Sequence, residues 1–118
     1  MLMLRYAAGA GPQEGTPELD DEMKRWMELN QELQSSGDVV ISAAGLETDE
    51  AATTVRAPGG GEAVLCDGPY AETKELLFSF YVVNVPDLDA AVALAKRMPC
   101  VEYGSVEIRP LSAIEQTG

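Results

Sequence analysis

The chain has 118 residues, which is a common size for one domain, and it carries 8 Lys and Arg against 20 Asp and Glu. The resulting formal net charge of −12 disfavours contact with a nucleic-acid backbone or with an anionic membrane surface. Histidine is absent, which excludes every His-based triad and His metal site, while 46% hydrophobic residues are typical of a folded domain.

Neither the chain start nor the cysteines indicate a special compartment or cofactor. The first residues do not form a signal peptide, and no apolar run reaches the roughly 18 residues of a membrane span, so we expect a cytoplasmic protein. Cys66 and Cys100 are far apart, and we expect both to be small buried residues because no base or cation adjoins Cys66. We expect no metal and no cofactor.

The first part of the chain predicts a strand, a long helix and a second strand. Residues 1–8 are an apolar run of strand length. Thr16 is typical of a helix N-cap, Pro17 suits the first helical position, and Gly37 suits the position just past the end. A second strand is expected at 39–46.

Two groups of side chains on this helix are assigned from their spacing. Met23, Trp26 and Met27 are expected in the core rather than at a cofactor site. An acidic group in the first turns is expected to be solvated and favoured by the helix dipole; its members are Glu18, Asp20, Asp21 and Glu22.

The rest of the chain predicts a hairpin, a central strand, a second helix and a final strand. Residues 52–57 and 62–66 flank a Pro-Gly-Gly-Gly turn, a pattern typical of a β-hairpin. The nearly continuous apolar run at 76–85 predicts a central strand, and Asp87 is expected to begin the second helix. The core-facing stripe of that helix is expected to be Leu88, Val92, Ala95 and Met98. The alternation at 105–109 predicts an amphipathic last strand.

This order of elements predicts one α+β domain over residues 1–118, a ferredoxin-like split βαβ sandwich with an inserted hairpin. Both helices would then cover one face of an antiparallel sheet. The central strand has large side chains in both alternating sets, which are Phe78, Phe80 and Val82 in one and Leu77, Tyr81 and Val83 in the other. Only one set can pack under the helices, so we expect a homodimer in which two sheets face each other.

Residues 67–75 are the most distinctive segment and read Asp-Gly-Pro-Tyr-Ala-Glu-Thr-Lys-Glu. The segment resembles the Asp-Gly-Pro-Phe (DGPF) motif of the YCII-related proteins, with Tyr70 in place of the usual phenylalanine. The apolar first strand, the start of the second helix at 87–91 and the closing segment 104–110 agree with that family in order and spacing. The resemblance implies a fold of the dimeric α+β-barrel type.

What the resemblance implies about activity is less specific. Most relatives are uncharacterised, and some resemble small enzymes, including a dehydrochlorinase-like lyase of chlorinated aromatic diols. Many DGPF-type relatives are encoded beside alternative sigma factors, which suggests a regulatory link. A His-Asp pair proposed as catalytic in one branch has no counterpart here, because histidine is absent. Phe78 and Ser79 stand where the family has small residues, so their bulk is expected to narrow the pocket.

The motif supplies two candidate catalytic residues, Asp67 and Lys74. The Asp67 carboxylate would be a general base, or it would accept backbone N–H groups in the turn that follows; the turn is favoured, and the two roles can coexist. Lys74 would hold an anionic or phenolate oxygen of a substrate, or it would belong to a solvated cluster with Asp67, Glu72 and Glu75.

The candidate binding residues are Arg5, Tyr6, Tyr70, Glu72 and Tyr81. The three tyrosines could offer hydrogen bonds to a ligand, although a tyrosine on a central strand is more often a core residue. Arg5 interrupts an apolar strand, so it either pairs with Glu107 or an acid of the motif, or it anchors an anionic ligand.

These residues support two main functions. The first is a small-molecule-binding or regulatory domain that acts as a dimer without catalysis. The alternative is a cofactor-free lyase or isomerase that uses Asp67 or a motif glutamate as base on a small anionic or phenolic substrate, with Lys74, Arg5 and Tyr70 stabilising the enolate or phenolate. A structural partner protein without a ligand is a third class. The expected partners are a second copy, a small-molecule ligand and a regulatory protein, and neither nucleic acid nor membrane.

Overall fold

The computed structural model describes residues 1–7, 9–47, 49–68 and 75–112. In the described chain the helices and strands follow the predicted order and lie close to the predicted bounds. They are β1 (Leu2–Tyr6), α1 (Pro17–Ser35), β2 (Val40–Gly45), β3 (Thr53–Arg56), β4 (Val64–Asp67), β5 (Leu76–Val83), α2 (Leu88–Lys96) and β6 (Gly104–Ile108).

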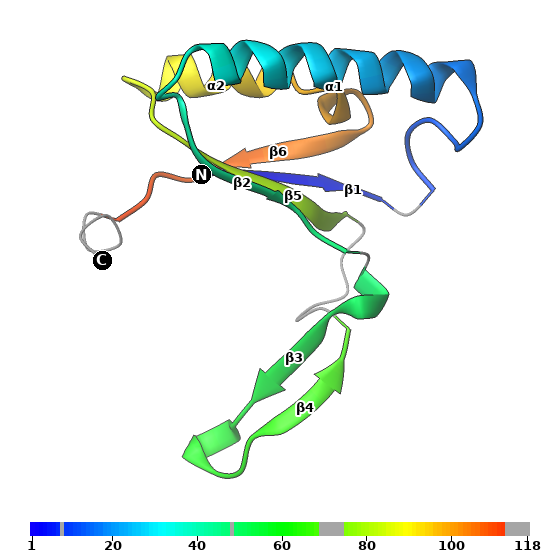
Figure 1. Cartoon of the computed structure of the whole chain (residues 1–118). Coiled ribbons are helices and arrows are strands. Elements are labelled where there is room, and N and C mark those ends of the chain that lie inside the picture. Colours follow the sequence, from blue (N-terminus) through cyan, green and yellow to red (C-terminus); the bar gives the residue numbers. More distant parts are fainter. Residues whose placement is uncertain (8, 48, 69–74, 113–118) are drawn as a thin grey trace.

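The domain is an antiparallel sheet with both helices on one face. The strand order is β2-β5-β1-β6, with antiparallel pairing throughout, and β3 and β4 pair separately as a hairpin. Figure 1 shows α1 and α2 side by side above the sheet. The predicted α+β class and the central positions of β1 and β5 are therefore confirmed.

Local sequence signals determine where the helices begin and end. The Thr16 hydroxyl accepts a hydrogen bond from the backbone N–H of Leu19 at 3.3 Å, which satisfies one of the free donors at the start of α1. Gly37 follows the helix end with a φ of 78°, a conformation that suits glycine. Asp87 caps α2 by accepting from the Ala90 N–H at 2.8 Å.

The buried side of α1 differs from the predicted one. The stripe that faces the sheet consists of Glu22, Trp26, Leu29 and Leu33. Met23 and Met27 are 57% and 61% exposed, so their prediction as core residues is wrong; each lies one position further around the helix than a stripe residue. Glu22 is only 6% exposed, so its prediction as a solvated acid is wrong too.

The buried side of α2 differs in part from the predicted one: Ala95 and Met98 are confirmed as buried, whereas the prediction is wrong at Leu88. The buried residues of α2 are Ala91, Leu94 and Ala95, and Met98, which follows the helix, is buried too. Leu88 is 63% exposed, and Val92 is only half-buried. The two alanines lie four positions apart on one side of the helix, and their small side chains let α2 approach the sheet closely.

A β-bulge in β5 changes which side chains face the helices. Leu4 pairs with Ser79, whereas Arg5 pairs with Leu77, so Phe78 is the extra residue. Phe78 packs against the helix-side core, and its ring meets Tyr6 edge to face at 4.7 Å between centroids. The predicted sets are therefore wrong at two positions: Phe78 lies on the helix side, apart from Phe80, and Leu77, opposite Arg5, lies on the other face from Tyr81.

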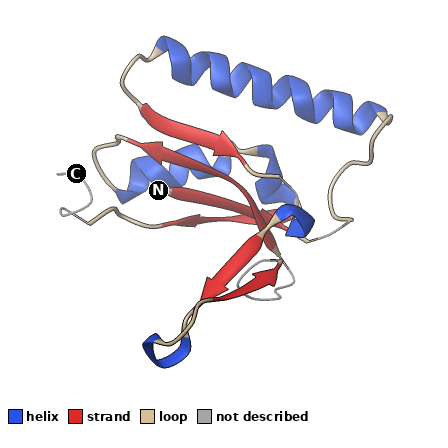
Figure 2. Ribbon diagram, turned by 60° about the horizontal axis from the view of Figure 1, so that its bottom comes forward, coloured by secondary structure: helices blue, strands red, loops and turns tan. Residues whose placement is uncertain are grey.

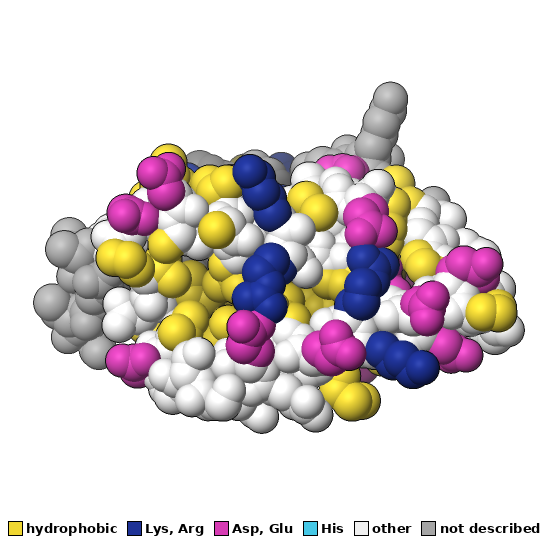
Figure 3. Space-filling model, turned by 90° about the horizontal axis from the view of Figure 1, so that it is seen from above, with side chains coloured by type: hydrophobic (Ala, Val, Ile, Leu, Met, Phe, Trp, Pro, Cys, Tyr) yellow, Lys and Arg dark blue, Asp and Glu magenta, His cyan; other side chains and the backbone are white. Residues whose placement is uncertain are grey.

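The core lies between the sheet and the helices. It contains Leu2, Leu4, Leu29, Leu33, Tyr81, Leu94, Met98 and Cys100. Gly104 allows β6 to lie tightly against β1 here, because a Cβ at this position would come within 2.0 Å of the Arg5 carbonyl oxygen. Two salt bridges lie at the surface on the helix side: Arg25 pairs with Glu102 at 2.6 Å, and Arg97 pairs with Glu32. Figure 3 shows such basic and acidic side chains next to one another around a hydrophobic band.

The β3–β4 hairpin projects below the sheet, on the side away from the helices. Figures 1 and 2 show that it leaves one end of the sheet as a separate arm. Val55, Val64 and Leu65 on this arm are exposed. Cys66 is exposed as well, so its prediction as a buried residue is wrong, whereas the burial predicted for Cys100 is confirmed.

Candidate functional site

Arg5 lies on the sheet face that the helices leave uncovered. Leu2 and Leu4 point into the core, so alternation along β1 turns Met3 and Arg5 to the opposite face. The Arg5 Nη1 atom donates to Glu107 Oε1 at 2.7 Å, which is one of the two roles that the sequence allows. The side chains of Arg5 and Glu107 are 28% and 45% exposed, so this ion pair by itself contributes only about 0–1 kcal/mol.

A second carboxylate joins this face from the end of the motif. Ser105 is the direct partner of Arg5 on β6, and its hydroxyl donates to Glu75 Oε1 at 2.6 Å. Glu75 is the last residue of the 67–75 motif, so the motif leads directly onto the uncovered face. We call Arg5, Glu75, Ser105 and Glu107 the Arg5 cluster.

The surroundings of the Arg5 cluster are apolar. Met3 pairs with Phe80 on β5 and with Glu107 on β6, and Leu77 lies directly opposite Arg5. Leu77 is 39% exposed. Arg109 lies on the same face, with its Nε 3.8 Å from Glu107 Oε2. Two cations and two carboxylates are thus set beside apolar side chains on this sheet face, an arrangement suited to a small ligand with both polar and apolar parts.

The sequence did not indicate Glu107 or Ser105 as site residues: Glu107 was expected only as a partner for Arg5, and Ser105 only as part of the last strand. Glu75 was expected either in a solvated group or, as a motif glutamate, as a candidate base. The signal was available in the alternation of residues 105–109, which places Ser105, Glu107 and Arg109 on one face. Nothing in the sequence indicated that this face is the uncovered one.

The structure places Tyr6 and Tyr81 on the other face, under the helices. The Tyr81 hydroxyl donates to Asn30 Oδ1 at 2.9 Å, and burial raises the pKa of Tyr81. Tyr81 and Ser79 line a shallow hollow of about 400 Å³ between α1 and β2. The Tyr6 ring is held edge to face by Tyr103 at 5.9 Å and by Phe78. The sheet therefore separates both tyrosines from Arg5.

Asp67 ends β4 on the arm and is exposed. Gly68, which follows Asp67, is held to the start of β3: its N–H donates to the Ala52 carbonyl at 2.6 Å, and Thr54 Oγ1 donates to its carbonyl at 2.9 Å. Gly68 has a φ of 99°, which favours glycine. The remaining motif candidates Tyr70, Glu72 and Lys74 lie outside the described residues.

A buried polar contact links α1 to the chain before β6. The Tyr103 hydroxyl donates to Glu22 Oε2 at 2.9 Å, while Glu22 Oε1 is buried without a hydrogen-bond partner among the described residues. Burial, and then the contact with Glu22, raise the pKa of Tyr103. Burial raises the pKa of the Cys100 thiol to about 11, so this cysteine is protonated at neutral pH and poorly suited to nucleophilic chemistry.

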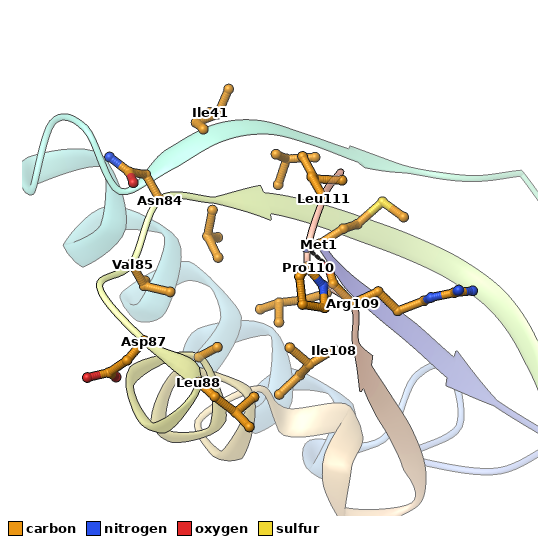
Figure 4. A pocket seen from close by; sticks show the side chains of 14 residues that line it. Met1, Ile41, Asn84, Val85, Asp87, Leu88, Ile108, Arg109, Pro110 and Leu111 are labelled. Carbon is orange, nitrogen blue, oxygen red and sulfur yellow. Dashed lines mark hydrogen bonds between the residues drawn. The ribbon is translucent and has the colours of Figure 1, made fainter. Parts of the chain in front are cut away.

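An apolar cavity of about 700 Å³ lies at the far end of the sheet from the arm, and we call it the end cavity. Its walls come from the start of α2 and the adjoining ends of β5, β1 and β6. Figure 4 shows Ile108, Pro110 and Leu111 around its middle, while the charged ends of Asp87 and Arg109 point away. No group of three or more Cys, Asp or Glu in the described ranges is arranged to hold a metal ion.

The fold and the site define a small α+β domain whose antiparallel sheet carries two helices on one face and a charged cluster on the other. The YCII-related domain model matches residues 1–115, so the chain belongs to the YCII-related family. An uncharacterized protein of Rhizobium meliloti (strain 1021) is 42% identical over 64 residues, which are 52% of this chain and 51% of that protein. The chain thus aligns with about half the length of this relative. None of the helices in the described ranges is long and apolar enough to cross a membrane.

Proposed function

We propose that this protein is a dimeric small-molecule-binding domain that holds a small anionic or phenolic ligand at the Arg5 cluster. The observation that carries the proposal is the Arg5–Glu107 pair on the uncovered sheet face, next to the apolar side chains of Met3, Leu77 and Phe80. Charged side chains are costly to bury when such a face packs against another surface, so they need partners there, and an anionic ligand is the further partner that we propose for Arg5.

The proposed dimer is of the ferredoxin-like, dimeric α+β-barrel type. The strand order β2-β5-β1-β6 supports it, because each strand–helix–strand unit brackets one strand of the other unit. Met3, Leu77 and Phe80 would lie between the two facing sheets. Exclusion of water there would strengthen the attraction between the Arg5 guanidinium and an anionic oxygen. In this proposal a regulatory protein partner distinguishes the ligand-bound dimer from the ligand-free dimer.

The geometry also favours one catalytic alternative, a cofactor-free lyase or isomerase. Glu75 is a carboxylate of the motif, and its hydrogen bond to Ser105 places it beside Arg5. Glu75 would remove a proton from the substrate, and Arg5 would stabilise the enolate or phenolate that forms. In this alternative Glu75, rather than Asp67, is the base.

Equilibrium binding of 4-nitrophenolate and of benzoate tests the proposal, with 4-nitrophenolate followed by its absorbance. We expect binding to the wild type and at least about a tenfold loss of affinity in Arg5→Gln, equal to about 1.4 kcal/mol. Arg25→Gln is the matched control, because it removes a cation on the helix side and should bind both probes normally. Unchanged affinity in Arg5→Gln would contradict the proposed site.

Turnover separates the two functions. The binding domain leaves both probes chemically unchanged. A lyase or isomerase would instead catalyse exchange of a proton on a carbon acid with solvent deuterium. Glu75→Gln should abolish this exchange, while benzoate should still bind. Exchange that survives in Glu75→Gln would exclude Glu75 as the base.

A further inference from the structure

The arm carries an apolar surface that nothing in the described part of the chain covers. Val55 and Leu65 are direct partners in the β3–β4 register, so their side chains share one face of the arm. They are 62% and 69% exposed. A two-stranded hairpin on its own is at best marginally stable in water, so this face of the arm requires a surface to pack against.

The end cavity is a second apolar surface at the edge of the domain. Its middle is apolar, and the ends of Asp87 and Arg109 point away from it (Figure 4), so it does not suit a charged ligand. Ile41 and Leu88 at its edge are 67% and 63% exposed. Apolar exposure of this extent around a cavity is typical of a site that contacts another surface.

The arm and the end cavity lie at opposite ends of the same sheet. The arm connects to the end where Tyr6 pairs with Leu76, whereas the cavity adjoins the end where Leu2 pairs with Ile108. Figure 1 shows that the arm points downward from the sheet, toward the space that faces the uncovered side. A twofold axis between two facing sheets, perpendicular to their strands, would bring each arm to the cavity end of the other copy.

We propose that the Val55–Leu65 face of each arm docks in the end cavity of a second copy. The inference rests on the proposed dimer and adds a reciprocal clasp to it. A second copy is the occupant because one chain carries both complementary surfaces, and a single twofold rotation forms both contacts and closes the assembly. The Arg5 clusters would then lie between the two clasps.

Disulfide trapping between two variants, each with one exposed cysteine besides the buried Cys100, tests the clasp directly. Both variants carry Cys66→Ser, which removes the exposed native thiol; one adds Leu65→Cys on the arm and the other adds Leu88→Cys at the cavity. After mixing and mild oxidation we expect a 65–88 disulfide, identified by peptide mass. Met23→Cys replaces Leu88→Cys in the control, because Met23 is similarly exposed on the outer side of α1, and it should give no such product.

Substitutions on the two faces of the arm supply an independent measurement. Leu65→Asp should raise the dimer dissociation constant at least about tenfold by analytical ultracentrifugation, because it places a charge in the apolar contact. Val64→Asp is the matched control on the opposite face of β4 and should leave the constant nearly unchanged. The clasp would be overturned, and the proposed dimer left intact, if Leu65→Asp did not change the dimer dissociation constant and no 65–88 disulfide formed. A monomeric wild type would overturn both.

Discussion

Glu22 of α1 and Tyr103, the residue before β6, meet in the interior through a hydrogen bond of 2.9 Å between the phenolic hydroxyl and the carboxylate. Tyr103 also supports the loop before α1, because a Cβ on Gly11 would come within 2.7 Å of its ring. This contact joins the long helix to the sheet at the end where the arm begins.

Removal of the Tyr103 hydroxyl should destabilise the domain. In Tyr103→Phe both oxygens of the buried Glu22 carboxylate would lack a partner, so we expect a loss of about 1–3 kcal/mol in the free energy of unfolding, measured with urea. Glu18→Gln, on the exposed part of the same helix, should change it by less than about 0.5 kcal/mol. Equal stability of Tyr103→Phe and the wild type would contradict the contact.

Gly104 should not tolerate a side chain. A Cβ there would lie 2.0 Å from the Arg5 carbonyl oxygen, so Gly104→Ala must push β6 away from β1, at a cost of about 2–4 kcal/mol. Thermal unfolding followed by circular dichroism measures the effect. Gly45→Ala is the matched control on the same sheet, since nothing lies within 4 Å of its Cβ, and it should unfold near the wild-type temperature.

The two cysteines should differ sharply in reactivity. Cys66 is exposed on the arm, whereas Cys100 is buried and burial raises its pKa to about 11, so at about pH 8 a disulfide reagent should titrate one thiol in the folded protein and two after denaturation. The buried thiol stabilises the fold fully below its ordinary pKa, and this contribution is lost as the pH rises through about 11. Rapid reaction of both thiols in the folded protein would contradict the burial of Cys100.

The Arg25–Glu102 pair should be visible in the acid titration. The hydrogen bond from Arg25, and then its charge, hold the pKa of Glu102 below its ordinary value of 4.5. The Arg25–Glu102 pair therefore stabilises the folded state above pH 4.5, and this stabilisation is lost as the pH falls through the lowered pKa of Glu102. Arg25→Gln should return the pKa of Glu102 to its ordinary range, as measured by carboxyl NMR. Lys24→Gln removes a neighbouring cation and should leave the pKa of Glu102 lowered.

The elements that the sequence predicted well depend on local chemistry. The cap at Thr16, the glycine after the helix end at Gly37 and the cap at Asp87 act within a few residues, so their effect does not depend on the rest of the chain. The turn of the arm follows in the same way from its proline and glycines. The pairing of Arg5 with Glu107 was one of two alternatives, and the structure shows that pair.

The orientation of side chains was decided by tertiary packing. The bulge at Phe78 reverses the alternation of β5 at one point, and a shift of one residue is sufficient to move a ring to the other face. Glu22 is buried because α1 turns that side to the sheet, where Tyr103 from a distant segment meets it. Neither the bulge at Phe78 nor the burial of Glu22 can be recognised in the local pattern of residues.

The sequence by itself determined the α+β order of elements, the helix ends and the hairpin, because those depend on neighbouring residues. The tertiary structure decided that Arg5, Glu75, Ser105 and Glu107 share one face and that Tyr6 and Tyr81 lie on the other. It also decided that the arm leaves the body at the end of the sheet opposite the apolar cavity. These relationships join residues up to 102 positions apart, and strand register and helix packing fix them only once the whole sheet has formed.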